Sequence, residues 1–478
     1  MSRLLLQPFE AVASGGVGVR RNLAWWALPR VLGRLSSVLL LPVYTRVLAP
    51  AELGTALAAL AISGAMALVV APGAEAVYLR YAYRPGDERE RWSGVGTVLA
   101  AHYALTTVAI GVLFALGPAI AGAVMPGIPA WPFYYLVLGA VAADAVSAPY
   151  QAAWRARRRA DVIAIIQALQ ALVVIGATLI ALLGLRWGAV SIVVGILAGS
   201  VVPLPFVAVT VLPKLAEPWN AAALRVVAPV MLAGFPVSVS TWVLTGFDRL
   251  LLNRERGVAE LGIFGVAYQI GAVLTFAVIT LNKEWGPLVA GLAVDGQGRA
   301  TVQSLAVRTL RLGVIFGSLM AVLSGPIVQV IGGGQYAASA SLVPIVVLIG
   351  LIQIPYLFFY NVATAQGRGG AMATASVLGV VVNVAANLLL IPRFGGMGAA
   401  WAGVLGYAAV ALALGSRPWN FIAIPSREAA WLLLLLATTV LGLRAPAPAL
   451  ALAGLAMGAL LVAEGYRYWR FLGRIRAT

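Results

Sequence analysis

Apolar segments about as long as a bilayer-crossing helix recur along the whole chain, and they constrain its fold more than any other feature. A helix needs about 20 apolar residues to cross the hydrocarbon core of a bilayer, and the sequence holds fourteen such segments. Only 10% of the residues are charged, against roughly 25% in soluble proteins. The sequence therefore predicts an all-α, multi-pass membrane protein with spans near 23–45, 52–73, 94–116, 132–152, 162–183, 188–212, 226–248, 261–284, 305–331, 338–361, 372–392, 396–416, 429–443 and 447–465.

The net charge of +17 comes mostly from arginines in the short loops between these segments. With the N-terminus inside, 21 of the 33 Lys and Arg fall in cytoplasmic segments and seven in outer loops. This asymmetry predicts that both termini are cytoplasmic, and the placement argues against a nucleic-acid partner. Residues 1–22 lack a signal-peptide core, so we expect a retained cytoplasmic lead-in. Residues 466–478 are predicted to form a basic cytoplasmic tail.

A short motif returns at a fixed offset. The sequence AELG at 51–54 recurs at 259–262, an offset of 208 residues, and Gly188 matches Gly398 at an offset of 210. The offset covers six predicted spans, and an even number preserves chain direction, so the halves are predicted to be parallel repeats. Chance similarity between Ala- and Gly-rich helices is the alternative. The repeat predicts two six-helix lobes around a central cavity and a two-helix appendage: 23–212, 226–416 and 429–465.

Two arginines interrupt the first apolar segment. Only 24 residues separate Arg21 from Arg46, just enough for one crossing. Arg34 is therefore expected near mid-depth, with Arg30 about one turn nearer the cytoplasm and on the same helix face. An arginine at a helix centre costs about 2.5–3.5 kcal/mol on insertion scales and normally faces a bundle interior or a wet cavity. We predict that Arg34 lines the cavity, and that Arg30 either joins it or reaches the cytoplasmic interface.

Other ionisable residues lie within the predicted spans. Asp144 interrupts span 4, where it would either neutralise Arg34 across the cavity or bind a coupling H⁺ or Na⁺. Lys283 and Glu284 are adjacent near the inner end of span 8. Lys283 is predicted to add a second-lobe cation to the cavity, and Glu284 is a further candidate for coupling or charge balance.

Three more charged or titratable sites have plainer alternatives. Arg308 and Arg311 share a face at the inner start of span 9, where they either bind substrate or anchor the helix. Asp248 and Arg249 close span 7 and are predicted to form a structural ion pair. The lone histidine, His102, is predicted to be a hydrogen-bonded structural residue.

The chain lacks the motifs of several enzyme classes. It has no GxxxxGK[ST] phosphate loop, no cysteine, no His/Asp/Glu cluster with metal-ligand spacing, and no nucleophile paired with a base in a loop. The deepest charges are basic, and guanidinium groups match phosphate oxygens in bidentate geometry. These features predict a transporter without a cofactor, suited to a phosphate carried on a lipid tail. A gradient, the membrane potential or consumption of the product would drive it.

Three stretches resemble the polysaccharide (O-antigen type) flippases of the multidrug, oligosaccharidyl-lipid and polysaccharide exporter superfamily. They are TRVLAPAELGTALAALAI (45–62), FDRLLLNRERGVAELGIFGVAYQI (247–270) and VVNVAANLLLIPRFGGMGAAWAGVLGY (381–407). The resemblance implies two lobes that alternate between inward- and outward-open V shapes, as in MATE-like transporters. It also implies a bacterial inner-membrane protein that moves an undecaprenyl-diphosphate-linked oligosaccharide to the outer leaflet, for surface polysaccharide such as the O-antigen of lipopolysaccharide.

The resemblance also suggests roles for particular residues. Cavity arginines of such flippases meet the diphosphate, which assigns this role to Arg30 and Arg34, with Lys283 as the counterpart from the second lobe. The implied partners are the lipid-linked oligosaccharide, membrane lipids, a polysaccharide polymerase and a chain-length regulator. The candidate sugar contacts, for which ordinary helix packing is the alternative, are Tyr150, Gln151, Tyr268 and Gln269.

Three other functions remain open. A lipid II flippase would also have fourteen spans, although the 247–270 stretch favours the polysaccharide branch. A multidrug or cation antiporter would favour a chamber rich in carboxylates. A membrane glycosyltransferase or polymerase would need a sizeable loop with acidic residues, whereas the longest outer loop, 117–131, has no charged residue.

Overall fold

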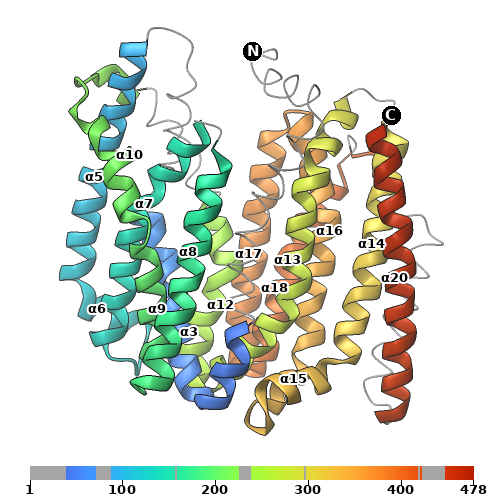
Figure 1. Cartoon of the computed structure of the whole chain (residues 1–478). Coiled ribbons are helices and arrows are strands. Elements are labelled where there is room, and N and C mark those ends of the chain that lie inside the picture. Colours follow the sequence, from blue (N-terminus) through green and yellow to red (C-terminus); the bar gives the residue numbers. More distant parts are fainter. Residues whose placement is uncertain are drawn as a thin grey trace. The chain divides into compact units, whose positions relative to one another are not determined.

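The computed structural model describes residues 39–70, 88–156, 159–225, 238–294, 298–417, 420–422 and 447–477. Regular secondary structure within these residues is helical throughout, which confirms the predicted all-α class (Figure 1). Ten helices in this part of the chain are long and apolar enough to cross a membrane, and each overlaps a predicted span. Most of predicted span 1, the first half of span 7 and all of span 13 lie outside the described residues.

By its internal contacts the chain divides into two compact units, the first of which takes residues 62–239 of the described chain together with 39–40. Proline breaks its longer helices: α9 ends just before Pro203, and α10 begins after it. This unit contains the end of α3 (Pro50–Val70), from Ile62 onward. Its other elements are α5 (Glu88–Ala115), α6 (Gly117–Val124), η1 (Ala130–Tyr134), α7 (Tyr135–Ala156), α8 (Ala160–Leu179), η2 (Ile180–Gly184), α9 (Val190–Val201), α10 (Leu204–Thr210) and η3 (Leu212–Ala216).

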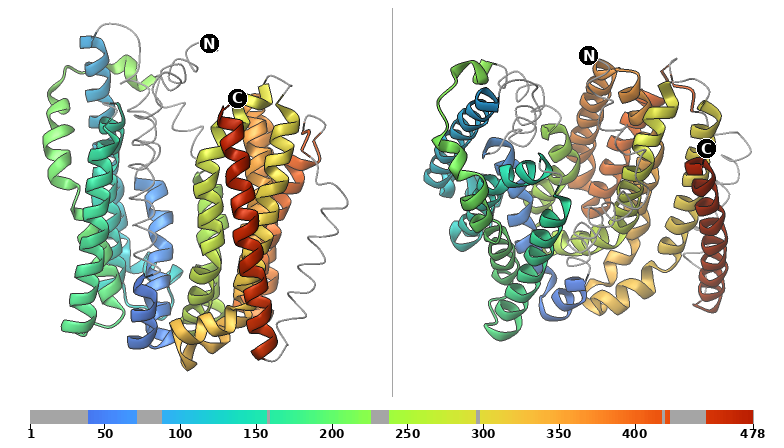
Figure 2. Two further views of the ribbon diagram at one scale, coloured as in Figure 1. Left: turned by 45° about the vertical axis from the view of Figure 1, so that its right-hand side comes forward. Right: turned by 45° about the horizontal axis from the view of Figure 1, so that its top comes forward.

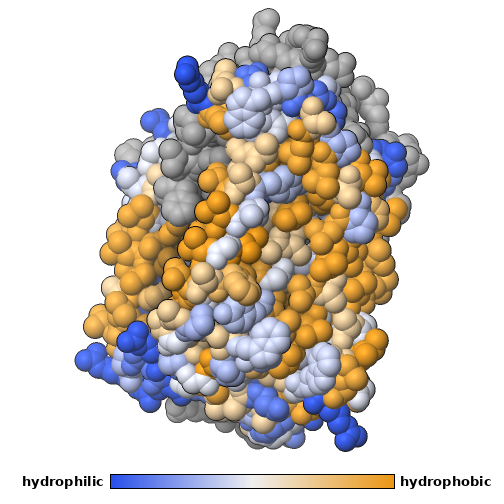
Figure 3. Space-filling model, turned by 90° about the vertical axis from the view of Figure 1, so that its left-hand side faces the viewer, coloured by the Kyte–Doolittle hydropathy of each residue, from blue (hydrophilic) through white to orange (hydrophobic). Residues whose placement is uncertain are grey.

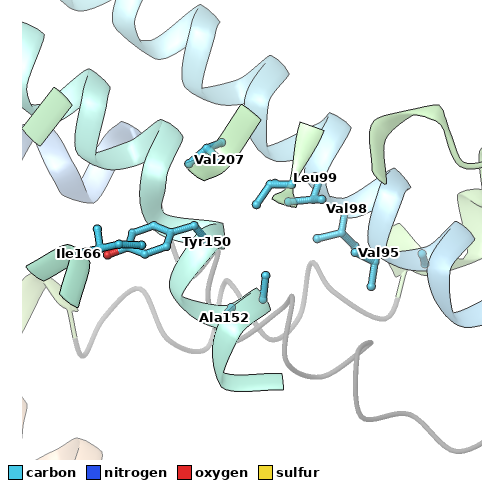
Figure 4. Packing of buried hydrophobic residues seen from close by; sticks show 10 residues of the cluster. Val95, Val98, Leu99, Tyr150, Ala152, Ile166 and Val207 are labelled. Carbon is cyan, nitrogen blue, oxygen red and sulfur yellow. The ribbon is translucent and has the colours of Figure 1, made fainter. Parts of the chain in front are cut away.

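The core of this unit forms where α5, α7, α8 and α10 meet. Figure 4 shows apolar side chains from these helices converging on one cluster, with the Tyr150 ring among them. The members that it labels are Val95, Val98, Leu99, Tyr150, Ala152, Ile166 and Val207. The cluster stabilises the unit because it buries apolar surface between these helices.

The second unit takes residues 41–61 and the described chain from Ser240 onward. α3 (Pro50–Val70) therefore belongs to this unit up to Ala61 and to the first unit beyond it. The remaining elements are η4 (Val243–Phe247), α12 (Asp248–Arg256), α13 (Val258–Val294), α14 (Arg299–Val322), α15 (Ser324–Gly332), η5 (Gly334–Ser341), α16 (Val343–Ala365), α17 (Gly369–Phe394), α18 (Gly396–Gly415) and α20 (Ala447–Ala477).

Within the second unit, α16 lies at the centre of the packing. It contacts α13, α14 and α18, while α17 pairs with α18 (Figures 1 and 2). The last helix, α20, packs along α14 on one side of the unit. Because α14 and α20 are antiparallel neighbours, the beginning of α14 and the end of α20 lie at the same end of this unit (Figures 1 and 2).

On one face of the molecule, many large apolar side chains lie between hydrophilic side chains at its two ends (Figure 3). Val108, Leu172 and Val209 of the first unit are each at least 65% exposed. A soluble protein would rarely present such a continuous apolar surface, so these side chains are suited to contact lipid.

Two predicted segments differ from the structure at their ends. The prediction of one helix over 305–331 is wrong, because α14 ends at Val322 and α15 follows from Ser324. Pro326 has no N–H to donate to the Val322 carbonyl, which removes a helical hydrogen bond at this junction. The last span was predicted over 447–465, but α20 continues to Ala477 through the basic tail, where Tyr468 and Leu472 are buried.

The repeated AELG motifs open α3 and α13, and their glycines lie against each other. A Cβ added at Gly54 would collide with the Val258 carbonyl and lie 2.9 Å from the Gly262 nitrogen. A Cβ added at Gly262 would collide with the Pro50 carbonyl and lie 3.2 Å from the Gly54 nitrogen. Val258 follows Pro50 by the same 208 residues, so the contacts are reciprocal, as a two-fold repeat requires. Small residues of this kind let membrane helices approach closely.

The glutamates of the two motifs have taken different partners. Glu52 accepts the backbone N–H of Ala49, 3.0 Å away, at the start of its own helix. Glu260 instead accepts the backbone N–H of Gly396, 2.8 Å away, at the start of α18. The preceding residue, Gly395, has a φ of 55°, and a Cβ there would collide with the Glu260 carboxylate. Glycine at 395 thus allows Glu260 to cap α18.

Candidate functional site

A cluster of tyrosines with one arginine lies inside the second unit, where α12, α13, α16 and α18 meet. The Arg249 guanidinium lies over the Tyr268 ring, 4.6 Å from its centroid. Tyr407 packs edge-on against Tyr356, with ring centroids 6.1 Å apart, and Tyr356 lies 5.9 Å from Tyr360. All five residues are partly exposed. We name them the tyrosine–arginine cluster.

Helical spacing brings the α16 members of this cluster together. Gln353, Tyr356 and Tyr360 follow one another at intervals of three and four residues, which places them on one face of α16. The Gln353 side chain hydrogen-bonds the Tyr407 hydroxyl on α18. Gln353 is only 5% exposed, so this contact lies inside the unit.

Asp248 and Arg249 contact each other differently from the predicted side-chain ion pair. The backbone N–H of Arg249 donates to the Asp248 carboxylate at 2.8 Å. Asp248 is only 7% exposed, whereas the Arg249 side chain is half-buried and its guanidinium lies over Tyr268. The arrangement puts a delocalised cation over an aromatic ring, a contact that is attractive because the ring face is electron-rich.

The C-terminal half of α13 carries a second polar group. Asn361 on α16 donates its side-chain N–H to Asn282 at 2.8 Å, and the Trp285 ring stacks on Phe358 with centroids 4.9 Å apart. These two contacts fix α13 against α16. Lys283 and Glu284, the predicted site residues between them, are exposed at the surface of the unit.

The predicted site residues of the first unit fall in two environments. Asp144 on α7 is exposed and accepts a hydrogen bond from the Ser200 hydroxyl on α9. Gln151 is partly buried, but Tyr150 is only 1% exposed, and its ring packs in the core of the unit (Figure 4). Of the two predicted roles of Tyr150, helix packing is the one that matches this burial.

Two of the predicted cations, Arg308 and Arg311, lie on α14. Arg308 lies where α14 meets α20, with its guanidinium 4.5 Å from the Phe471 ring centroid. Arg311 is partly buried on the same helix. Arg30 and Arg34 lie outside the described residues, so their place in the cavity stays a prediction.

The predicted sugar contacts of the second unit are adjacent on α13. Gln269 is partly exposed and follows Tyr268 directly in the sequence.

His102 is buried and its Nε2 donates to the Ala145 carbonyl at 3.0 Å, as predicted for a structural histidine. This bond requires the proton on Nε2 and joins α5 to α7. Among the described residues, no group of three or more His, Cys, Asp and Glu could hold a metal ion.

Sequence reasoning missed Tyr356, Tyr360, Tyr407 and Gln353, and it gave Arg249 only a structural role. The tyrosines of α16 carried a usable signal, because a four-residue spacing of amphipathic rings in an otherwise apolar span is unusual for pure lipid contact. Tyr407 carried none, since its partners come from another helix.

Residues 19–287, more than half of the chain, match a family model described as polysaccharide biosynthesis protein. The chain belongs to this polysaccharide biosynthesis family. The family predicted from the three resembling stretches is thereby confirmed. The comparison with curated proteins returned no match.

Solved structures share the fold of this protein at low identity. The lipid II flippase MurJ, in an inward closed conformation, has a TM-score of 0.71 and 13% identity, over 92% of this chain and 97% of that one. An inward-facing multidrug resistance MATE family transporter of the MOP superfamily has a TM-score of 0.65 and 12% identity, over 88% and 99%. The Vibrio cholerae MATE transporter VcmN, in its bent form, has a TM-score of 0.54 and 13% identity, over 89% and 99%. The protein therefore has the fold of MATE and MurJ membrane transporters.

Proposed function

We propose that this protein moves a polyprenyl-diphosphate-linked oligosaccharide across the cytoplasmic membrane by alternating access. Membership of a polysaccharide biosynthesis family carries the proposal, and the transporter fold supports it. Such a substrate joins a long apolar tail to two phosphates and a sugar chain. Its headgroup must pass the hydrocarbon core, so the protein has to replace water with its own charges and hydrogen bonds.

The proposed roles follow the chemistry of the side chains. Arg34, Arg30 and Lys283 would meet the diphosphate, because charged donors bind phosphate oxygens strongly. In the tyrosine–arginine cluster, Arg249 would add a guanidinium, and the tyrosine rings and hydroxyls would stack on sugars and donate hydrogen bonds to them. Asp144 and Glu284 would balance charge or bind a coupling ion. No step of this movement needs a bond to be made or broken.

Lipid II is the second candidate substrate. The structure with a TM-score of 0.71 is named a lipid II flippase, and the same chemistry of cations and tyrosines would suit any headgroup that joins phosphates to sugars. A strain that lacks its own lipid II flippase separates the two: growth rescued by this protein would favour lipid II, and failure to rescue would favour the oligosaccharide.

Replacing Arg34 tests whether the predicted diphosphate contact is needed for transport. Arg34→Ala should fold but lower the rate of lipid-linked oligosaccharide transfer about tenfold, the loss expected for about 1.4 kcal/mol from one charge-assisted hydrogen bond in a wet cavity. Arg34→Lys keeps the charge and should retain most of the rate. The measurement is the appearance of labelled oligosaccharide on the far face of proteoliposomes. If Arg34→Ala transfers the oligosaccharide at the normal rate, Arg34 does not bind the substrate.

A further inference from the structure

Three arginines surround a hollow where α14 and α20 pack at one end of the second unit. The hollow, of about 130 Å³, is lined by Arg308 of α14 and by Arg467, Arg470 and Phe471 of α20. Both helices belong to the second unit, and Figures 1 and 2 show them side by side. This hollow is distinct from the tyrosine–arginine cluster, which is built from α12, α13, α16 and α18.

Contacts between the two helices fix the register that brings the arginines together. Tyr468 is 5% exposed, and its hydroxyl lies 3.3 Å from the Thr309 hydroxyl, one residue beyond Arg308. Leu472, one turn along α20, is also buried. Arg308 then stacks over the Phe471 ring at 4.5 Å. Arg308 is thus held by packing and not extended freely into solvent.

The hollow carries more positive charge than its neighbours neutralise. Arg467 pairs with Glu464 at 2.6 Å, so three guanidinium groups and one carboxylate leave a net charge of +2. Within the described part of the chain, no carboxylate lies at ion-pair distance from Arg308 or Arg470. Arg470 lies instead 5.7 Å from the Tyr466 ring centroid. Like charges held together repel one another, and a phosphate group would offset that repulsion while accepting bidentate hydrogen bonds.

The position along α20 indicates which phosphate this is. The helix has 31 residues, which is about 46 Å at 1.5 Å per residue, whereas the hydrocarbon core is about 30 Å thick. Leu455 and Val462 are more than 70% exposed on its apolar stretch. Farther along, Tyr466 and Trp469 are 64% and 67% exposed. Exposed tyrosine and tryptophan typically mark the headgroup level of a membrane.

We propose that the hollow between α14 and α20 binds the phosphate of an anionic membrane phospholipid, whose acyl chains lie along the exposed apolar face of α20. Basic hollows between membrane helices on the cytoplasmic side are a recurrent way of binding such headgroups. The site is separate from the path proposed for the transported substrate. It gives Arg308 a ligand other than that substrate.

The test compares lipid binding by the full-length protein and two matched variants. Phosphatidylglycerol is titrated into purified protein in detergent, and its apparent affinity is read from the rise in melting temperature, with phosphatidylcholine as the neutral arm. Phosphatidylglycerol should bind the unaltered protein, whereas phosphatidylcholine should not. The double variant Arg308→Gln/Arg470→Gln should lower the apparent affinity for phosphatidylglycerol at least tenfold. Arg299→Gln, which removes a charge from the opposite face of α14, should leave it unchanged.

Several results would overturn the assignment. If the double variant binds phosphatidylglycerol as tightly as the unaltered protein, the hollow is not the binding site. If Arg299→Gln weakens phosphatidylglycerol binding as much as the double variant does, the binding reflects general surface charge. Inorganic phosphate that binds as tightly as phosphatidylglycerol would make it a free-anion site. If the double variant does not fold, Arg308→Lys/Arg470→Lys keeps both charges but loses the forked geometry, and it should still bind phosphatidylglycerol more weakly than the unaltered protein. Unweakened binding would contradict the proposal.

Discussion

Replacing Gly54 or Gly262 with alanine should strongly destabilise the second unit. The new Cβ at either position would collide with a backbone carbonyl of the facing helix, at Val258 or Pro50, and no rotamer change can relieve a backbone collision. The start of α3 would have to move away from α13. Overpacking typically costs about 1–3 kcal/mol, and we expect the upper part of that range here. Because the contacts are reciprocal, the two substitutions should cost similar amounts.

The melting temperature of the purified variants checks this result. Gly291→Ala is the matched control, because Gly291 lies on the same helix as Gly262 and a Cβ there would meet nothing within 4 Å. It should be neutral or slightly stabilising, since alanine favours a helix over glycine. If Gly54→Ala and Gly262→Ala melt like Gly291→Ala, the close approach of α3 and α13 is not a feature of the folded protein.

Arg249→Gln should lower the transport rate about 30-fold. The guanidinium over Tyr268 would provide a charged donor to phosphate in a half-buried position, and losing a hydrogen bond to a charged group there costs about 2 kcal/mol. Lysine keeps the charge but not the planar fork of donors, so the transport rate of Arg249→Lys should lie between those of the unaltered protein and Arg249→Gln. Transfer of labelled lipid-linked oligosaccharide in proteoliposomes gives the rates.

Arg254→Gln serves as the control for this experiment. Arg254 is an exposed arginine in the last turn of the same helix, and its loss should leave transport unchanged. Melting temperatures of both variants show whether a slow rate reflects unfolding. A folded Arg249→Gln protein with the normal rate would exclude Arg249 from the substrate path.

The spans could be predicted from the sequence because hydrophobic length is a property of each segment by itself. The ends of the spans depended on local chemistry that hydropathy does not report. Pro326 divides what reads as one apolar run, and the polar end of α20 stays helical because it packs on α14 through Tyr468 and Leu472. The AELG repeat was a stronger guide, since its two glycines form one reciprocal contact.

The candidate site was harder to predict because it depends on which helices meet. Charge alone drew attention to Lys283, Asp144 and Arg308, yet Arg308 lies beside the last helix, a contact that no local pattern reports. Tyr407 joins the tyrosine–arginine cluster only through Gln353 and Tyr356 of a neighbouring helix. Pairing Arg249 with the adjacent Asp248 followed sequence proximity, whereas the side chain reaches Tyr268 instead.

The most direct measurement is transfer of two labelled lipids by the purified protein in proteoliposomes without ATP. One carries an oligosaccharide on polyprenyl diphosphate, and the other is lipid II. The account predicts that the oligosaccharide lipid reaches the opposite leaflet faster than in protein-free vesicles and faster than lipid II. Transfer of lipid II alone, or no transfer of either lipid above the protein-free rate, would contradict it.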